Sequence, residues 1–225
     1  MQHNTIAHKI PVYDIDLTML VHVQKYFNYA SESQIYGKNK HLIHQHLNRD
    51  KSSNIQLALT NRPVIFEDVP IWKSDEAGRF NPKMIDTYIQ SKNIPPDSVA
   101  SLTIKMVGGE LERCVLYTFA CIKVWEKQTS QLNRLKIIMP ANAMFGYNSG
   151  GSSPKRRAYT LKERIDDESV MMSIGFYALE EFTGQIHIND DTVEFMSKKD
   201  PWGVFFKGEK IRVLSDYKYD MMHLR

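Results

Sequence analysis

Three adjacent basic residues, Lys155, Arg156 and Arg157, are the most distinctive chemical feature of the chain. They follow a segment rich in Gly and Ser at residues 146–154, and Tyr159 comes shortly after them. Adjacent cations on flexible backbone are suited to bind the phosphates of RNA or of lipid headgroups, or to dock on a nuclear-import receptor. A plain solvated turn is the alternative interpretation. The candidate docking residues are Lys155, Arg156, Arg157, Lys162 and Arg164.

The charge of the chain changes sign directly after this stretch. Residues 123–164 contain nine basic and two acidic side chains, whereas residues 165–200 contain nine acidic and two basic ones. Two solvated faces of one fold would explain this distribution. The sharper interpretation is an acidic surface that meets the basic face of another copy, because opposite potentials favour association. It predicts a homo-oligomer with the self-association residues Asp166, Asp167 and Glu168.

Three histidines, His41, His44 and His46, form the densest group of metal-capable side chains. On a helix His41 and His44 would share a face while His46 would point elsewhere, so a zinc site would need a further ligand from the fold. The acid that metal hydrolases place at a fixed spacing from such histidines is missing. We therefore interpret the segment as a polar loop and predict no metal site.

Asp216 and Lys218 form an Asp-x-Lys pair after an apolar stretch, as in one half of a metal-dependent nuclease site. Such a site needs another acid, with Glu194 and Asp190 as candidates, to hold Mg²⁺ against a scissile phosphate. Short acid–lysine patterns arise often by chance. The nuclease therefore stays an alternative hypothesis.

The remaining acidic pair, Asp14 and Asp16, places two carboxylates on one face of a predicted strand. The chain has no Walker A loop, no G-x-G-x-x-G, no G-x-S-x-G and no Cys-x-x-Cys pair. This argues against the common nucleotide-binding, serine-hydrolase and zinc-ribbon classes. We expect no enzyme activity and no cofactor.

The composition is that of a globular protein. Of the 225 residues, 42% are hydrophobic and 24% charged, and the aromatic content of 11% gives the chain enough apolar surface to offset its ordering entropy. There is no apolar run of about 20 residues that would cross a bilayer and no signal peptide, so we expect an intracellular protein. Cys114 and Cys121 lie seven positions apart in a predicted helix, too far for a disulfide, and we expect both to be buried.

The first hundred residues predict few regular elements. Near alternation of apolar residues from Ile10 to Phe27 favours a strand or hairpin arm, and the polar segment 30–53 predicts a loop around one helical turn. A short edge strand is predicted at Val64–Phe66 between prolines. Asn81 and Pro82 predict the start of a helix that the Pro95–Pro96 pair ends.

The rest of the chain predicts one principal helix, at residues 110–127, and several strands. The order of elements indicates an α+β fold: a mostly antiparallel β-sheet with two or three packed helices. We divide the chain into an N-terminal region, 1–97, and a core domain, 98–225. The predicted strands are residues 101–107, 135–139, 158–164, 170–179, 184–188, 192–196, 204–206 and 210–214.

The order of elements from Leu102 to Phe195 resembles the core of rhabdovirus matrix proteins. Residues 102–106 resemble the first core strand of that family, and the helix at 110–127 stands where its principal helix comes. Three later segments resemble strands that follow in the family: Arg157–Leu161, Ile174–Tyr177 and Gly184–Ile188. The chain departs from the family at its beginning, since it lacks a lysine-rich tail and a P-P-x-Y motif.

The resemblance implies a viral matrix-type structural protein that self-associates and links the ribonucleoprotein to the inner membrane face during assembly. Its implied partners are further copies of the chain, the viral nucleoprotein or RNA, and an anionic membrane surface. The implied location is the virion and the host cytoplasm, peripheral at the membrane, with a nuclear phase possible. The alternative function, suggested by the basic residues without the resemblance, is that of a nucleic-acid-binding or movement-type protein without catalysis.

Overall fold

The structure is a computed structural model of the chain. It describes residues 11–24, 40–95, 98–111, 113–129, 132–146, 153–166, 182–183, 185–189, 192–198 and 210–211.

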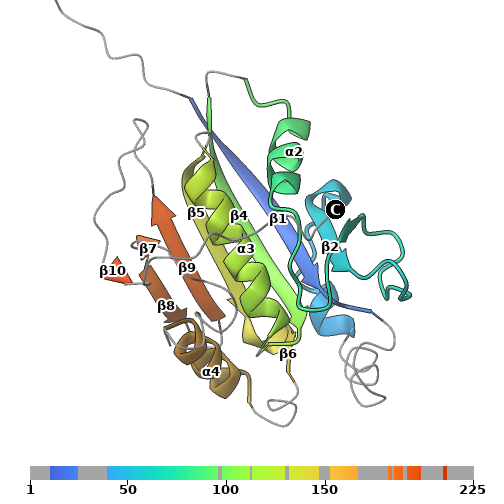
Figure 1. Cartoon of the computed structure of the whole chain (residues 1–225). Coiled ribbons are helices and arrows are strands. Elements are labelled where there is room, and N and C mark those ends of the chain that lie inside the picture. Colours follow the sequence, from blue (N-terminus) through green and yellow to red (C-terminus); the bar gives the residue numbers. More distant parts are fainter. Residues whose placement is uncertain are drawn as a thin grey trace, which may run out of the picture.

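The centre of the fold is a sheet that runs in the order β3-β2-β1-β4-β5-β9-β8 (Figure 1). Its first five strands in this order are parallel to one another. Their bounds are β1 Val12–Val21, β2 Asn54–Ala58, β3 Ile71–Lys73, β4 Val99–Gly109 and β5 Leu132–Pro140.

The predicted mostly antiparallel sheet is therefore wrong. The parallel order follows from the connections, because α2 (Lys83–Ser91) joins β3 to β4 and α3 (Cys114–Gln128) joins β4 to β5. A helix between two strands returns the chain to the same end of the sheet, which makes the two strands parallel. The α+β part of the prediction remains plausible, since helices and a mixed sheet are both present.

Among the described residues, the antiparallel strand pairs lie at the far side of the sheet and in a small ribbon. β9 (Thr192–Lys198) pairs antiparallel with β5 and with β8 (Gln185–Asn189). β7 (Phe182–Thr183) pairs antiparallel with β10 (Lys210–Ile211), and β6 (Met144–Phe145) pairs parallel with the end of β4.

The main core lies between one face of the sheet and three helices. Figure 1 shows α3 along β4 and β5, α2 near the start of β1, and α4 (Pro154–Asp166) beside β8. The strands contribute alternate apolar residues to this face, as Ile15, Leu17 and Met19 of β1 show. Burial of such side chains contributes about 25 cal/mol per Å² of apolar surface, so this layer is the main source of stability.

The opposite face of the sheet is covered by a smaller apolar cluster at the carboxyl ends of β1 and β4. Leu20 and Val107 pack there against Ile43, which comes from the helical turn at residues 40–44, and against Phe66 and Val69. Gln56 of β2 holds the connection to β3 in place, because its Nε2 donates to the carbonyl oxygens of Phe66 and Val69, both at 2.7 Å.

Several predicted elements are confirmed: the strand within residues 10–27, the strands at 101–107, 135–139, 184–188 and 192–196, the helix predicted to start at Pro82, and the helix at 110–127. The predicted strand at 158–164 is wrong, since these residues belong to α4. Val64 forms only an isolated bridge with Gln24, and the edge strand is β3 instead. The predicted strands at 170–179 and 204–206 lie outside the described residues, as does 212–214.

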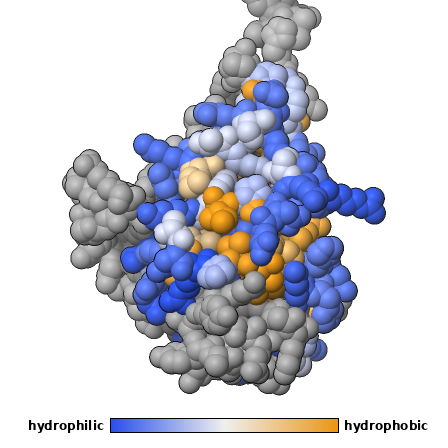
Figure 2. All heavy atoms as spheres, turned by 90° about the vertical axis from the view of Figure 1, so that its right-hand side faces the viewer, coloured by the Kyte–Doolittle hydropathy of each residue, from blue (hydrophilic) through white to orange (hydrophobic). Residues whose placement is uncertain are grey.

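The edge strand β3 exposes an apolar side chain. Figure 2 shows an apolar patch framed by hydrophilic residues on the side of the molecule nearest β2 and β3, and Ile71 is 53% exposed. Three features protect this edge from pairing with another chain: its length of three residues, Pro70 directly before it, and the exposed Lys73 at its end.

Candidate phosphate-docking site

The docking residues predicted from the sequence lie on α4, Pro154–Asp166. The helix begins where the sequence has Ser153 followed by Pro154: the Oγ atom of Ser153 accepts a hydrogen bond from the N–H of Arg156 at 3.3 Å. Ser before a helix and Pro at its first position are strong start signals. These signals, and not the alternation of residues 158–164, decide the local structure.

One face of α4 is apolar and packs on the main core. Ala158 and Leu161 are fully buried and Ile165 is 4% exposed. The spacing of three and four residues fits the helical period, and α4 contacts β8 and β9 through this face. The helix is therefore held by its packing, and its orientation on the sheet is fixed.

The outer face of α4 carries cations, one aromatic ring and one exposed acid, Glu163. Lys155, Arg156 and Arg164 are exposed, Lys162 is half-buried, and Tyr159 is 45% exposed. Since residues four apart lie on the same side of a helix, Arg156 and Arg164 line up with Thr160 between them. We call these five residues the α4 basic face: Lys155, Arg156, Tyr159, Lys162 and Arg164.

Arg157 has a different position from its neighbours. Its side chain is half-buried, and its Nε atom donates to the carbonyl oxygen of Ala141 at 2.8 Å. Ala141 belongs to the short helix η2 (Ala141–Ala143), which follows β5. Arg157 thus ties the first turn of α4 to the body of the protein.

The positions of Lys155 and Arg156 are unfavourable for the helix itself. Both lie in the first turn, where the helix dipole is positive, and the first turn contains no acidic residue. A cation there costs a helix about 0.3–1 kcal/mol, whereas an anion near the same N–H groups is stabilised. The sequence therefore places cations where an anionic partner, and not the helix, would benefit.

The acidic residues assigned to self-association are only partly described. Asp166 is the last residue of α4, and Asp167 and Glu168 lie outside the described residues. Asp216 and Lys218 of the nuclease hypothesis also lie outside them, as does Asp190. Glu194 is on β9, where it forms an ion pair with Lys136 of β5 at 3.0 Å.

The three histidines are spread over the helical turn at residues 40–44 and the bend after it. His41 and His44 are exposed, whereas the Nε2 atom of His46 is hydrogen bonded to Oδ1 of Asn142 at 3.0 Å. Within the described ranges, there is no group of three or more His, Cys, Asp or Glu residues placed to hold a metal ion.

A second polar cluster lies at the carboxyl end of β1, between its neighbours β2 and β4. In parallel α/β sheets, ligands bind at such a point, where the strand order changes direction. His22 follows β1 directly and is fully buried, with a backbone φ of 49°. Its Nε2 atom is hydrogen bonded to Oγ of Ser74, which follows β3, at 2.9 Å.

Burial lowers the pKa of His22 to about 4, and the nearby charge of Asp75 offsets this effect only in part. The ring is therefore neutral at pH 7. Asp75 itself closes the loop after β3, since its carboxylate accepts from the N–H groups of Ala77 and Arg79 and forms an ion pair with Arg79 at 2.6 Å. With Ser74 only 5% exposed, the cluster is suited to hold this loop and not to reach a substrate.

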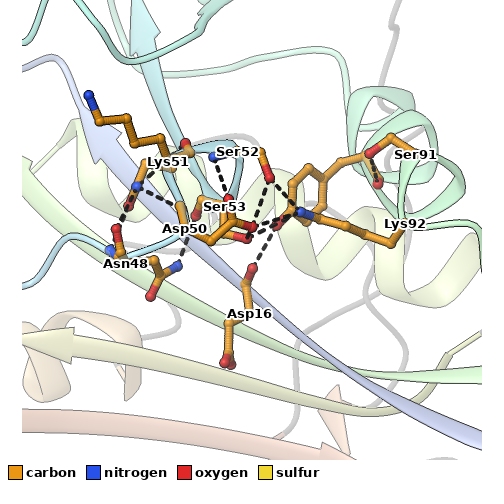
Figure 3. A network of polar contacts seen from close by, with 10 residues as sticks. Asp16, Asn48, Asp50, Lys51, Ser52, Ser53, Ser91 and Lys92 are labelled. Carbon is orange, nitrogen blue, oxygen red and sulfur yellow. Dashed lines mark hydrogen bonds and ion pairs between the residues drawn. The ribbon is translucent and has the colours of Figure 1, made fainter.

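A third polar network fixes the turn before β2 to the end of α2 (Figure 3). Asp50 caps the short helix η1 (Lys51–Ser53), because its carboxylate accepts from Ser52 and from the Oγ of Ser53. These bonds lower the pKa of Asp50 to about 2. Lys92 reaches the same turn from α2 and donates to the Oγ atoms of Ser52 and Ser53 at 3.0 and 3.2 Å.

Neither the cluster around His22 nor the one around Asp50 was predicted from the sequence. His22 and Ser74 are 52 positions apart, and no spacing motif links them. For Asp50 the signal was present, since Asp followed by two Ser residues favours a capped turn.

Comparisons of the chain with protein-family models, with curated proteins and with solved structures found no match. Among the described residues, no helix has the length and apolar character needed to span a membrane.

Proposed function

We propose that the protein is a structural protein that docks on RNA phosphates through the α4 basic face. The observation that carries the proposal is the arrangement of Lys155, Arg156 and Arg164 with the exposed Tyr159 on the outer side of a helix whose inner side is fixed in the core. Such a surface matches a single-stranded nucleic acid: the cations meet phosphates, and an aromatic ring offers a stacking platform for a base.

Docking on RNA is one part of the matrix-type role that the sequence suggests, in which a structural protein holds a viral ribonucleoprotein. Tyr159 favours RNA over a lipid surface as the partner of this helix. A phosphate-only surface gains little from an exposed ring on the same helix as the cations, whereas base stacking on an aromatic side chain contributes about 1–3 kcal/mol.

The test is the binding of a fluorescently labelled single-stranded RNA, measured by anisotropy at several salt concentrations. The docking variant combines Lys155→Gln, Arg156→Gln and Arg164→Gln. The control variant removes the same charge elsewhere, by Arg49→Gln, Lys73→Gln and Lys83→Gln, which are exposed and distant in sequence. We expect the docking variant to bind more weakly, with a salt slope reduced by about 2, because each lost phosphate contact removes about 0.7. The control variant should bind as the wild type does.

Equal weakening in both variants would show that only net charge matters and would overturn the assignment to α4. Absence of RNA binding by the wild type would overturn the proposal as a whole, and flotation with phosphatidylserine vesicles would then show whether the partner is a membrane. Tyr159→Phe should retain affinity and Tyr159→Ala should lose about 5- to 160-fold, since only the ring stacks on bases. Equal affinity of the two Tyr159 variants would remove stacking from the proposal.

A further inference from the structure

The face of the sheet that does not carry α2, α3 and α4 has its charges arranged by strand. Residues in register on neighbouring parallel strands point to the same face, so Asp14, Ser101 and Arg134 form one row across β1, β4 and β5. Asp16, Thr103 and Lys136 form the next row. The β1 positions are acidic, the β4 positions are small and neutral, and the β5 positions are basic.

We call the four charged residues of these two rows the charged sheet face: Asp14, Asp16, Arg134 and Lys136. The side chain of Asp14 is 84% exposed and that of Arg134 46%, so their ion pair of 3.7 Å across Ser101 is open to water. Exposed pairs of this kind contribute about 0–1 kcal/mol, which means that both partners can exchange for others at little cost. Lys136 is more restricted, because it pairs with Glu194 of β9.

An open face is unusual in the parallel part of a sheet. Parallel strands are as a rule covered on both faces, since the connections between them place helices or loops on each side. Here the helices in Figure 1 cover one face, and the cluster around Leu20 and Val107 covers only the carboxyl ends of β1 and β4 on the other. Near the amino ends of β1 and β5 the described residues leave Asp14, Asp16 and Arg134 exposed.

The order of charges across this face is self-complementary. A two-fold axis that lies in the face and runs along β4 would place β1 of one copy over β5 of the other, and β5 over β1. Acidic residues would then meet basic residues on both sides of the axis, with the small residues of the two β4 strands between them. Such an isologous contact uses the same patch on both subunits.

We propose that two copies of the chain associate through the charged sheet face. The equal numbers of acidic and basic residues favour this occupant over others. A nucleic acid or an anionic membrane would be repelled by Asp14 and Asp16, and a uniformly basic protein surface by Arg134 and Lys136. A second copy, turned about the two-fold axis, presents its basic β5 residues to the acidic β1 residues of the first copy, and its acidic β1 residues to the basic β5 residues. The inference is independent of RNA docking, because α4 lies on the opposite face.

The charge of the middle strand does not oppose this contact. Lys105 is the charged residue of β4, and its Nζ atom donates to the carbonyl oxygen of His46 at 3.2 Å, as does Oγ1 of Thr18 at 3.3 Å. The ammonium is thus held toward the loop that covers the carboxyl end of the face. The β4 residues that lie on the two-fold axis between the charged residues are therefore Ser101 and Thr103.

Charge reversal in two complementary variants tests the proposal, with the molar mass of the full chain measured by light scattering after gel filtration. The acidic-strand variant combines Asp14→Arg with Asp16→Lys. The basic-strand variant combines Arg134→Glu with Lys136→Gln, where Gln keeps a donor for Glu194. Wild type is expected to be dimeric at low salt and monomeric at high salt, and each variant alone to be monomeric because like charges face each other.

An equimolar mixture of the two variants should form a heterodimer, since each copy then offers the charges that the other lacks. This gain of association cannot arise from misfolding. A control variant with Glu76→Arg and Glu163→Arg, two exposed acids outside this face, should dimerise as the wild type does. A monomeric wild type at low salt, variants that dimerise alone, or a mixture that stays monomeric would each overturn the proposal. The docking variant of α4 should remain dimeric, so failure of RNA binding and failure of dimerisation are separate results.

Discussion

The imidazole of His22 and the hydroxyl of Ser74 are hydrogen bonded at 2.9 Å in the interior of the protein, although the residues are 52 positions apart. His22 directly follows β1, an inner strand of the sheet, and Ser74 directly follows the edge strand β3. The bond therefore connects the carboxyl ends of two strands that are separated by β2. It also fixes the start of the loop that Asp75 closes.

The free energy of unfolding should decrease as the pH falls, because of His22. The folded-state pKa is about 4 and the ordinary value is 6.5, so the unfolded chain binds a proton at a higher pH than the folded one. This contribution is fully present above pH 6.5 and is lost as the pH falls from 6.5 to 4. The loss amounts to about 3 kcal/mol, measured as the free energy of unfolding in urea at a series of pH values.

The control for this prediction is another histidine. His22→Asn keeps a residue that tolerates a positive φ and should remove most of the pH dependence between 6.5 and 4. His41→Gln, on an exposed helical turn, should leave it unchanged. A pH profile of the His22 variant that matches the wild type would contradict the assignment.

Gln56 should be more important for stability than a polar residue usually is. Its buried amide donates to two carbonyl oxygens, those of Phe66 and Val69, and the Phe66 oxygen also accepts from the N–H of Val69 at 3.3 Å. Gln56→Leu would leave both oxygens without this donor and should lower the free energy of unfolding by about 2–4 kcal/mol. The exposed Gln45→Leu is the control and should change it by less than about 0.5 kcal/mol.

The local elements could be predicted wherever the pattern was strong and complete. The alternation around Val12–Val21 and the helical period of Cys114–Gln128 were sufficient, because both segments are buried along a whole face. α4 was predicted as a strand because the alternating residues were given more weight than Ser153 and Pro154. β2 was missed because Asn54 and Gln56 make it look polar, and their side chains are buried through hydrogen bonds that only the fold supplies.

The parallel arrangement of the strands was not predicted. The order strand, helix, strand from Ile71 to Pro140 is nevertheless the signature of parallel pairing. The basic residues of α4 were identified from the sequence as a group. That Arg157 anchors the helix whereas its neighbours face solvent was not predicted. Whether Arg157 faces solvent or Ala141 depends on the helical phase, and a strand would have placed it differently. The charged sheet face likewise depends on the register of β1, β4 and β5.

Arg157 and Arg156 should respond differently to the same substitution. Arg157→Gln loses the bond to Ala141 and should lower the free energy of unfolding by about 1–2 kcal/mol, measured by thermal or urea denaturation. Arg156→Gln should leave stability unchanged or raise it slightly, because a cation is removed from the positive end of the helix dipole. It should weaken RNA binding instead. Equal stability losses in the two variants would contradict the separation of an anchoring from a docking residue.

The buried ion pair between Lys123 and Glu126 on α3 should be costly to break on one side only. Both side chains are 4% exposed, and the ammonium of Lys123 also lies 4.1 Å from the centre of the Phe195 ring on β9. Lys123→Met leaves the carboxylate of Glu126 in an apolar environment and should lower the free energy of unfolding by about 3–5 kcal/mol. Glu126→Leu, which removes the carboxylate that pairs with the ammonium of Lys123, should cost a similar amount.

The double variant with Lys123→Met and Glu126→Leu distinguishes a pair from two independent contributions. It removes both charges and replaces them with apolar side chains of similar size, so it should be more stable than either single variant. The measurement is a double-mutant cycle in urea, with the pair's coupling as the result. A double variant that loses the sum of the two single losses would show that Lys123 and Glu126 act separately, with Phe195 as the main partner of the lysine.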